Sequence, residues 1–205
     1  AGEEGGWINL PEGLAFKLAS QQRWVADVHY INTSPDPVCV NTAYYLELVP
    51  ADEVEAFAAA FNLDVGKISL PSGEVSTERF DCVWEQEVNI LSIAGHMHGF
   101  GESFEIVVHP EDGPSELVYE VEDWQPIYQS LAPTTAFEAG EFVVAEGTTL
   151  ETICTWNNTT DESLSYPDEM CTTVGVAFPL DGPLFCDNGV WTQQSTPGPS
   201  GAGVV

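Results

Sequence analysis

Short runs in which apolar and polar residues alternate make up most of the chain. A period of two residues is typical of β-strands with one buried face, because successive side chains point to opposite faces. Gly, Pro, Asn and Asp separate the runs at short intervals, as in strands joined by turns. The pattern predicts an all-β fold, an antiparallel jelly-roll β-sandwich. Its predicted strands are residues 14–18, 24–31, 38–49, 64–70, 74–83, 88–98, 102–109, 116–122, 141–144, 148–156 and 172–178.

Three stretches depart from the alternating pattern. Residues 51–61, ADEVEAFAAAF, are rich in Ala and Glu and are the one candidate helix, although a strand or a connector is also compatible with them. Residues 1–13, rich in Gly and Glu, predict an arm. Residues 191–205, rich in Gly, Ser and Pro, predict a flexible tail. The jelly-roll domain is therefore expected at residues 51–190.

The charge balance limits the partners that the chain can have. Its 205 residues include 33 acidic and only four basic ones, which gives a net charge of −29. Such a surface repels nucleic acids and anionic membranes, so neither is an expected partner. It is typical of a highly solvated protein in a salty or extracellular setting. No apolar run approaches the roughly 18 residues of a membrane-spanning helix.

The five cysteines indicate an oxidising compartment. Their spacing lacks the paired CxxC units of zinc ribbons, so disulfides are the better explanation. With the first residue being Ala rather than Met, they predict a processed, exported protein, either extracellular or periplasmic. The odd number leaves one cysteine without a partner in the chain. Asn32, Asn157 and Asn158 begin sequons that a eukaryotic secretory route would glycosylate, and the sequence leaves their use open.

His96 and His98 are the main candidates for chemistry. They end the predicted strand at 88–98, and two of the four histidines of the chain lie in this one motif. Because residues two apart in a strand share a face, both imidazoles are expected on the same side. Such a pair suits copper or zinc, although a His-x-His motif alone is a weak signal.

Met170 is the candidate third ligand. Cys154 and Cys171 flank a polar, turn-rich loop, which suggests a disulfide that holds both ends of the loop. Met170 precedes the second of these cysteines, so the disulfide would fix its position. A thioether with two imidazoles is a soft ligand set that selects copper over magnesium or calcium. A lone methionine is more often a core residue, so this assignment depends on the histidines.

These motifs resemble those of the copper type II, ascorbate-dependent monooxygenases, which include peptidylglycine α-hydroxylating monooxygenase and dopamine β-monooxygenase. The resemblance is carried by His96-Met-His98-Gly, by Asp168-Glu-Met170-Cys171, by Leu70-Pro-Ser-Gly-Glu and by Val28-His29-Tyr30, and it extends over roughly residues 10 to 186. It implies that His96, His98 and Met170 hold the oxygen-binding copper of the catalytic domain. Residues 14–50 then resemble the end of the N-terminal domain of the family, where His29 would be one ligand of a second, electron-transferring copper.

The resemblance also sorts the cysteines. It implies the disulfides Cys154–Cys171 and Cys82–Cys186. Cys39 would be unpaired, because its partner in the family lies in an N-terminal domain that this chain mostly lacks.

The chain departs from the family in three respects. No adjacent His-His pair is present to complete the second copper site, so either a missing N-terminal domain or a second chain supplies it, or the protein binds only one copper, which is the number of sites expected here. The Arg that holds a substrate carboxylate in the peptide-hydroxylating members is replaced by Ala94. Thr172 and Val174 replace the Asn and Tyr that contact substrate in those members. Recognition of a peptide C-terminus is therefore not expected.

Two functions follow from this comparison, and the sequence leaves both open. The first is the catalytic-copper half of a monooxygenase that hydroxylates a substrate carbon with dioxygen and a reductant such as ascorbate. The alternative is a non-catalytic copper-binding or structural subunit of an extracellular assembly on the same scaffold, since fold does not settle function. His109 is expected to be a surface residue rather than a ligand, and Tyr45 to lie in the core or at an edge of the sandwich.

Overall fold

The protein is built almost entirely of β-strands, as the sequence predicts. Its structure is a computed structural model that describes residues 9–18, 32, 34–43 and 45–193. Two short 3-10 helices, η1 (Ala51–Glu53) and η2 (Pro126–Gln129), are the helical elements of these residues. The strands are β1 (Leu14–Phe16), β2 (Ala56–Asp64), β3 (Ser69–Leu70), β4 (Val75–Val83), β5 (Val88–His96), β6 (Gly101–His109), β7 (Glu116–Val121), β8 (Thr134–Ala136), β9 (Val143–Val144), β10 (Thr149–Asn157), β11 (Leu164–Ser165), β12 (Thr172–Phe178), β13 (Leu184–Asp187) and β14 (Val190–Gln193).

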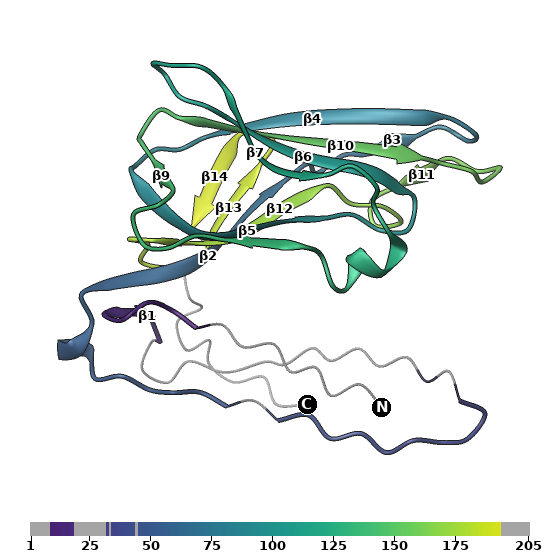
Figure 1. Ribbon diagram of the computed structural model, residues 1–205. Coiled ribbons are helices and arrows are strands. Elements are labelled where there is room, and N and C mark those ends of the chain that lie inside the picture. Colours follow the sequence, from purple (N-terminus) through teal and green to yellow (C-terminus); the bar gives the residue numbers. More distant parts are fainter. Residues whose placement is uncertain (1–8, 19–31, 33, 44, 194–205) are drawn as a thin grey trace, which may run out of the picture.

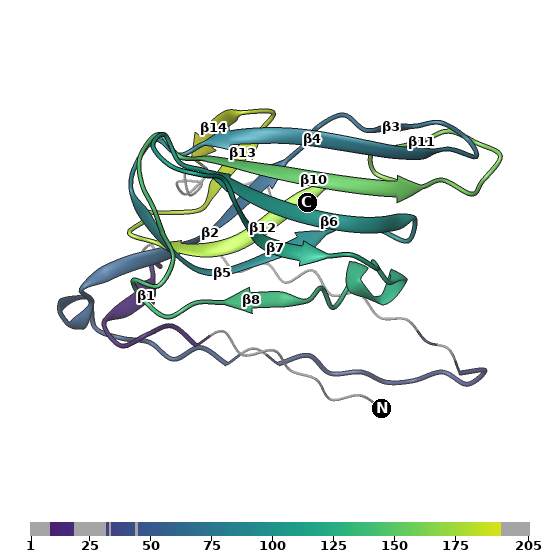
Figure 2. The same cartoon turned by 45° about the horizontal axis from the view of Figure 1, so that its top comes forward.

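Two sheets lie face to face as the layers of a β-sandwich (Figure 1). The larger sheet has the order β14-β13-β2-β12-β5-β8, with β1 added beside β2 and β9 beside β5. The smaller sheet has the order β4-β10-β6-β7, and β3 pairs with β11 beyond it. Figure 2 shows the same two layers after a turn about the horizontal axis. The pairing is antiparallel except where β1 and β13 run parallel to β2. The jelly-roll connectivity stays a prediction.

Alternation along the strands decides which side chains enter the core. Phe61 and Leu63 of β2 are buried between the sheets, whereas Asn62 and Asp64 point the other way. The same rule turns Gly95 of β5 inward, where a Cβ would lie 2.6 Å from the Phe104 ring of the opposite sheet. His96 therefore faces outward from the larger sheet.

Both disulfides of the described residues join one sheet to the other. Cys82 of β4 pairs with Cys186 of β13, and Cys154 of β10 pairs with Cys171, directly before β12. These are the pairs that the family resemblance implies. In a chain-entropy estimate, closing separations of 104 and 17 residues stabilises the fold by about 5 and about 3 kcal/mol respectively. Cys39 is free and exposed.

Several details of the sequence prediction are corrected by the structure. Residues 51–61 form η1 and the first part of β2, so the helix is wrong and the alternative of a strand or connector is right. The described residues of 38–49 belong to no strand, and Tyr45 is 80% exposed rather than part of the core. Residues 191–193 belong to β14 instead of a tail. The predicted strand at 24–31 and the rest of the tail lie outside the described residues.

Candidate metal site

His96 and His98 lie side by side where β5 ends and the chain turns toward β6. Their ring centroids are 5.2 Å apart, with the planes nearly perpendicular at 87°. Met97, between them, is fully buried in the core, and a Cβ on Gly101 would lie 2.8 Å from its methyl carbon. The two imidazoles therefore share the outer side of the chain, opposite to Met97.

The ring of His98 is oriented by a hydrogen bond to the loop before β12. Its Nδ1 lies 2.9 Å from the carbonyl oxygen of Asp168. A carbonyl only accepts, so Nδ1 carries the proton and Nε2 keeps its lone pair. Metal-binding histidines are commonly oriented in this way, by donating the other ring N–H to a carbonyl or carboxylate.

The backbone of His98 is held as firmly as its ring. Its N–H donates to Oε2 of Glu169 at 2.9 Å, and its carbonyl accepts from Nε1 of the buried Trp124 at 3.0 Å. With the bond to Asp168, three polar groups of one residue are fixed from two different loops. The position of the imidazole is thus set before any ligand arrives.

Glu169 links the turn at residues 98–100 to the loop that precedes β12. Its carboxylate is fully buried and accepts three hydrogen bonds. Besides the His98 N–H, the donors are the Phe100 N–H at 2.8 Å and Trp156 Nε1 at 3.0 Å. In the sequence Glu169 differs from the other acidic residues only in its place beside Met170 and Cys171. Trp124 was likewise not among the predicted site residues.

Met170 follows the segment that is hydrogen-bonded to His98. In the β5–β12 pair Thr172, two residues after Met170, lies opposite His96. The bonds of His98 to Asp168 and Glu169 hold the two segments together at this point. Cys171, the next residue, is tied by its disulfide to β10. The three predicted ligands thus lie on two segments that meet at one end of the larger sheet.

His96 has a different environment from His98. Among the described residues its ring has no hydrogen-bond partner, and the side chain is about half-buried. Burial lowers the pKa of His96, and the neighbouring His98 lowers it further. The imidazole is therefore neutral at pH 7, the form that binds metals.

Asp64 continues the outward-facing row beyond Thr172. The Thr172 hydroxyl donates to Oδ1 of Asp64 at 3.1 Å, so the row runs Asp64, Thr172, His96 across three strands. Burial raises the pKa of Asp64; the hydrogen bond from Thr172 opposes the rise, and the charge of Asp187 adds to it. A pocket of about 210 Å³ adjoins Asp64 and is lined also by Asn62, Tyr166 and Asp187. The pocket is separated from His96 by the width of β12.

The donor atoms of His96, His98 and Met170 favour one kind of metal. Among the described residues, no group of three or more His, Cys, Asp or Glu side chains is placed to hold a metal ion. The thioether of Met170 is the third donor that the sequence offers to His96 and His98. Two imidazoles and a thioether suit copper, so the residues present are compatible with the metal that the family resemblance implies.

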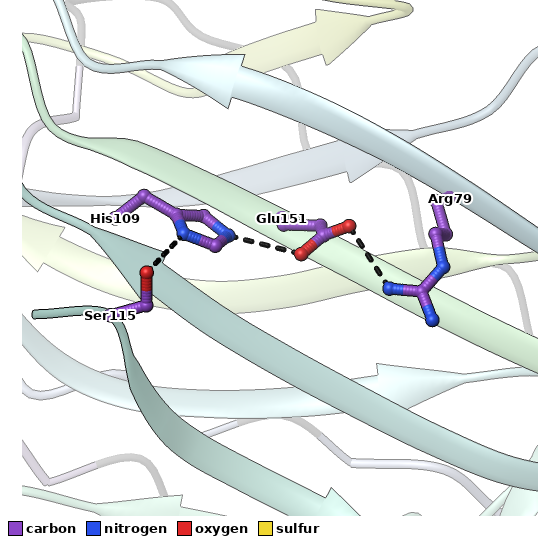
Figure 3. A network of polar contacts seen from close by, with 4 residues as sticks. All are labelled: Arg79, His109, Ser115 and Glu151. Carbon is purple, nitrogen blue, oxygen red and sulfur yellow. Dashed lines mark hydrogen bonds and ion pairs between the residues drawn. The ribbon is translucent and has the colours of Figure 1, made fainter.

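The other two histidines take no part in this cluster. His29 lies outside the described residues. His109 lies partly exposed on the outer face of the smaller sheet, in a network with Ser115, Glu151 and Arg79 (Figure 3). Its Nδ1 is 2.7 Å from the Ser115 hydroxyl and its Nε2 is 3.0 Å from Glu151, whose other oxygen is 3.2 Å from Arg79. The order serine, histidine, carboxylate resembles a hydrolytic triad, but these residues line neither the pocket beside Asp64 nor the pocket at Trp84. We interpret the network as cross-strand pairing on a solvated face.

Asn158 is a structural residue. Its fully buried amide nitrogen donates to the carbonyls of Leu70, Pro71 and Glu162, and its oxygen accepts from Thr160. A folded chain has no free amide here to carry a glycan. Asn32 is exposed, with its amide bonded to the Asp36 carbonyl, and Asn157 is partly buried on β10.

Comparison with known proteins adds no family to this picture. No protein-family model and no curated protein matches the chain. Within the described residues, no helix has the length and apolar character needed to cross a membrane. The case for a copper site therefore depends on the motifs and on their arrangement.

Proposed function

We propose that His96, His98 and Met170 bind a copper ion, and that the chain is an exported copper protein similar to the catalytic half of an ascorbate-dependent monooxygenase. The hydrogen bond from His98 Nδ1 to the Asp168 carbonyl carries the proposal. It leaves Nε2 available beside a neutral His96 and ties the histidine segment to the loop that bears Met170. Export is supported by the two disulfides, which persist in oxidising compartments.

The residues around the ligands would keep the site in place. Glu169 and Trp124 hold the backbone of His98, and the Cys154–Cys171 disulfide anchors the segment of Met170. When bound, copper would supply the activation of dioxygen for hydroxylation of a substrate carbon, with ascorbate or another reductant as electron source. The 210 Å³ pocket beside Asp64 is the candidate place for a small substrate.

A non-catalytic copper-binding or structural role is the second candidate. It is favoured by the histidine content, since the four histidines at 29, 96, 98 and 109 include no adjacent pair for a second copper. Ala94 also stands where the peptide-hydroxylating members of the family have a carboxylate-binding Arg. A chain with one copper would then need its electrons from elsewhere or would not turn over.

Copper binding can be tested with variants that have matched controls within the chain. Affinity for copper(I) is measured by competition with a chromogenic chelator, and X-ray absorption reports the sulfur ligand. Met170→Leu should remove the copper–sulfur signal, and Met97→Leu, in the core, should keep it. His96→Ala should weaken binding by at least about tenfold, whereas His109→Ala should not change it. If Met170→Leu keeps the sulfur signal, or His96→Ala binds as tightly as the parent, the ligand assignment is wrong.

Activity separates the two candidate functions. Oxygen consumption is recorded with ascorbate, copper and a panel of small substrates, with His96→Ala as the control. Turnover that needs copper and His96 supports the monooxygenase. Tight copper binding without turnover, including after addition of a partner that carries a His-His pair, supports the binding protein.

A further inference from the structure

A second pocket, larger than the one beside Asp64, lies toward the other end of the larger sheet. It has a volume of about 670 Å³, within the range of small-molecule sites. It is formed where β2 begins, where β4 leads into β5, and where β12 leads into β13. In β12, Thr172 pairs with His96 while Phe178 lies six residues further on, so about 20 Å of strand separates the pocket from the histidines. The pocket is thus independent of the copper site.

Aromatic rings and carboxylates share the lining of this pocket. The rings are Phe57, Trp84 and Trp191, and the last two pack with centroids 4.8 Å apart. Trp84 is buried and its indole N–H has no acceptor among the described residues, so packing alone holds this ring. Glu55, Glu85 and Asp181 supply three carboxylates. Rings next to carboxylates are the chemistry that recognises organic ammonium groups.

One ammonium group is already bound at the edge of this pocket. Nζ of Lys17, directly after β1, lies 3.0 Å from Oδ1 of Asp181 and 5.3 Å from the centroid of the Phe57 ring. The parallel pairing of β1 with β2 brings Lys17 beside Phe57, and the Leu180 N–H bonds to the Phe57 carbonyl, which positions Asp181. Lys17 therefore shows how this edge receives a primary ammonium group, by an ion pair and a cation–π contact together.

Lys17 balances only one of the three carboxylates. Glu55 and Glu85 have no ion-pair partner among the described residues, so the lining keeps two negative charges after Lys17 is counted. A ligand with several ammonium groups on a flexible aliphatic chain would meet these charges and pack its methylene groups on the rings. The net charge of −29 would further raise its local concentration.

We propose that this pocket binds linear polyamines, and that Lys17 is an intramolecular occupant that competes for the Asp181 end. A ligand ammonium replaces the Lys17 ammonium between Asp181 and Phe57, and its other ammonium groups pair with Glu55 and Glu85. Removing Lys17 should therefore strengthen binding, which a merely supporting residue would not do.

The test is calorimetric titration of the full chain with spermidine at physiological salt, with a chelator present so that copper plays no part. Lys17→Ala should bind spermidine about threefold more tightly than the parent. The control is Lys67→Ala, which makes the same charge change at an exposed lysine after the other end of β2, and its affinity should stay within about twofold of the parent. Asp181→Asn should bind about fivefold or more weakly, whereas the exposed Asp161→Asn should not differ from the parent.

Two results would overturn the proposal. If Asp181→Asn and Asp161→Asn weaken binding equally, spermidine senses only the overall acidity of the protein. If Lys17→Ala does not differ from Lys67→Ala, Lys17 does not compete for the site. Phe57→Leu, which keeps apolar volume but removes the ring, should weaken binding about threefold if the cation–π contact is used. Near-UV circular dichroism checks that each variant is folded.

Discussion

Replacing Glu169 by Gln tests whether this buried carboxylate fastens the candidate site. In the structure Oε2 accepts two N–H groups and Oε1 accepts one. A glutamine has one oxygen, so at best it keeps the bonds of His98 and Trp156 and turns its NH₂ toward the Phe100 N–H. The change alters one atom and almost no volume, which isolates the hydrogen bonding from the packing.

The magnitude follows from the donors that lose their partner. An unsatisfied buried N–H costs about 1–3 kcal/mol. The two remaining bonds lose the assistance of the charge, at about 1 kcal/mol each. Removal of a buried charge offsets part of this cost. We expect Glu169→Gln to lower the free energy of unfolding by about 2 kcal/mol, which for a chain of this size lowers the melting temperature by about 4–8 °C.

Urea and thermal unfolding of the metal-free protein measure this loss. Glu162→Gln is the matched control, because Glu162 lies exposed in the same β10–β12 connection, and it should change stability by less than about 0.5 kcal/mol. Hydrogen exchange of the Phe100 amide should also become faster in Glu169→Gln alone. If both variants unfold alike, the carboxylate does not hold the two loops together and the account of a preorganised His98 fails.

Three further changes test other parts of the fold. Asn158→Asp turns a carboxylate oxygen toward three backbone carbonyls, so urea unfolding should show a loss of at least about 3 kcal/mol; a loss under 1 kcal/mol would contradict the buried network. Gly175→Ala places a Cβ 2.4 Å from the Ser92 carbonyl oxygen and should lower the free energy of unfolding by at least about 3 kcal/mol. Gly99→Ala, whose Cβ would have nothing within 4 Å, should lower it by under about 1 kcal/mol, and equal losses would refute the close approach. Asp64 has a folded pKa above its ordinary value of 3.8, so the native state binds the proton more tightly and stability falls as pH rises from 3.8 through the folded pKa. Asp64→Asn should remove this fall, giving a metal-free protein more stable than the parent at pH 7 but not at pH 3, and an unchanged pH slope would contradict the assignment.

The alternating pattern predicted most of the strands because one face of each central strand is buried. In β4 and β10 the alternation marks the core side, and the predicted bounds of β4, β10 and β12 differ from the observed ones by a residue or less. The stretch at 51–61 was harder because Ala favours helices, while the packing of Phe61 between the sheets and the pairing of β2 on both sides override that preference. At 38–49 the content of Tyr and Val was misleading, since the described residues there are exposed and form no strand.

Some residues of the candidate site could be predicted from the sequence and others could not. His96 and His98 could be found from spacing alone, because a period of two fixes their common side. Glu169 and Trp124 could not, since their roles come from contacts with His98 across 71 and 26 residues of sequence, which no local pattern encodes. The pocket at Lys17 depends on β1 pairing with β2, which the sequence also leaves unspecified.

The two disulfides adjoin different candidate sites, although both are anchored in the larger sheet, and this predicts separate effects. Cys171 adjoins Met170, whereas Cys82 and Cys186 lie beside the tryptophans of the large pocket, since Cys186 pairs with Trp191 across β13 and β14. Cys154→Ala/Cys171→Ala should therefore weaken copper(I) binding and leave spermidine binding unchanged. Cys82→Ala/Cys186→Ala should weaken spermidine binding and leave copper(I) binding unchanged. Each double variant loses about 3–5 kcal/mol, so the titrations are made with a stabilising osmolyte under which near-UV circular dichroism is native. If either double variant is folded but has lost both copper(I) binding and spermidine binding, the two sites are not independent.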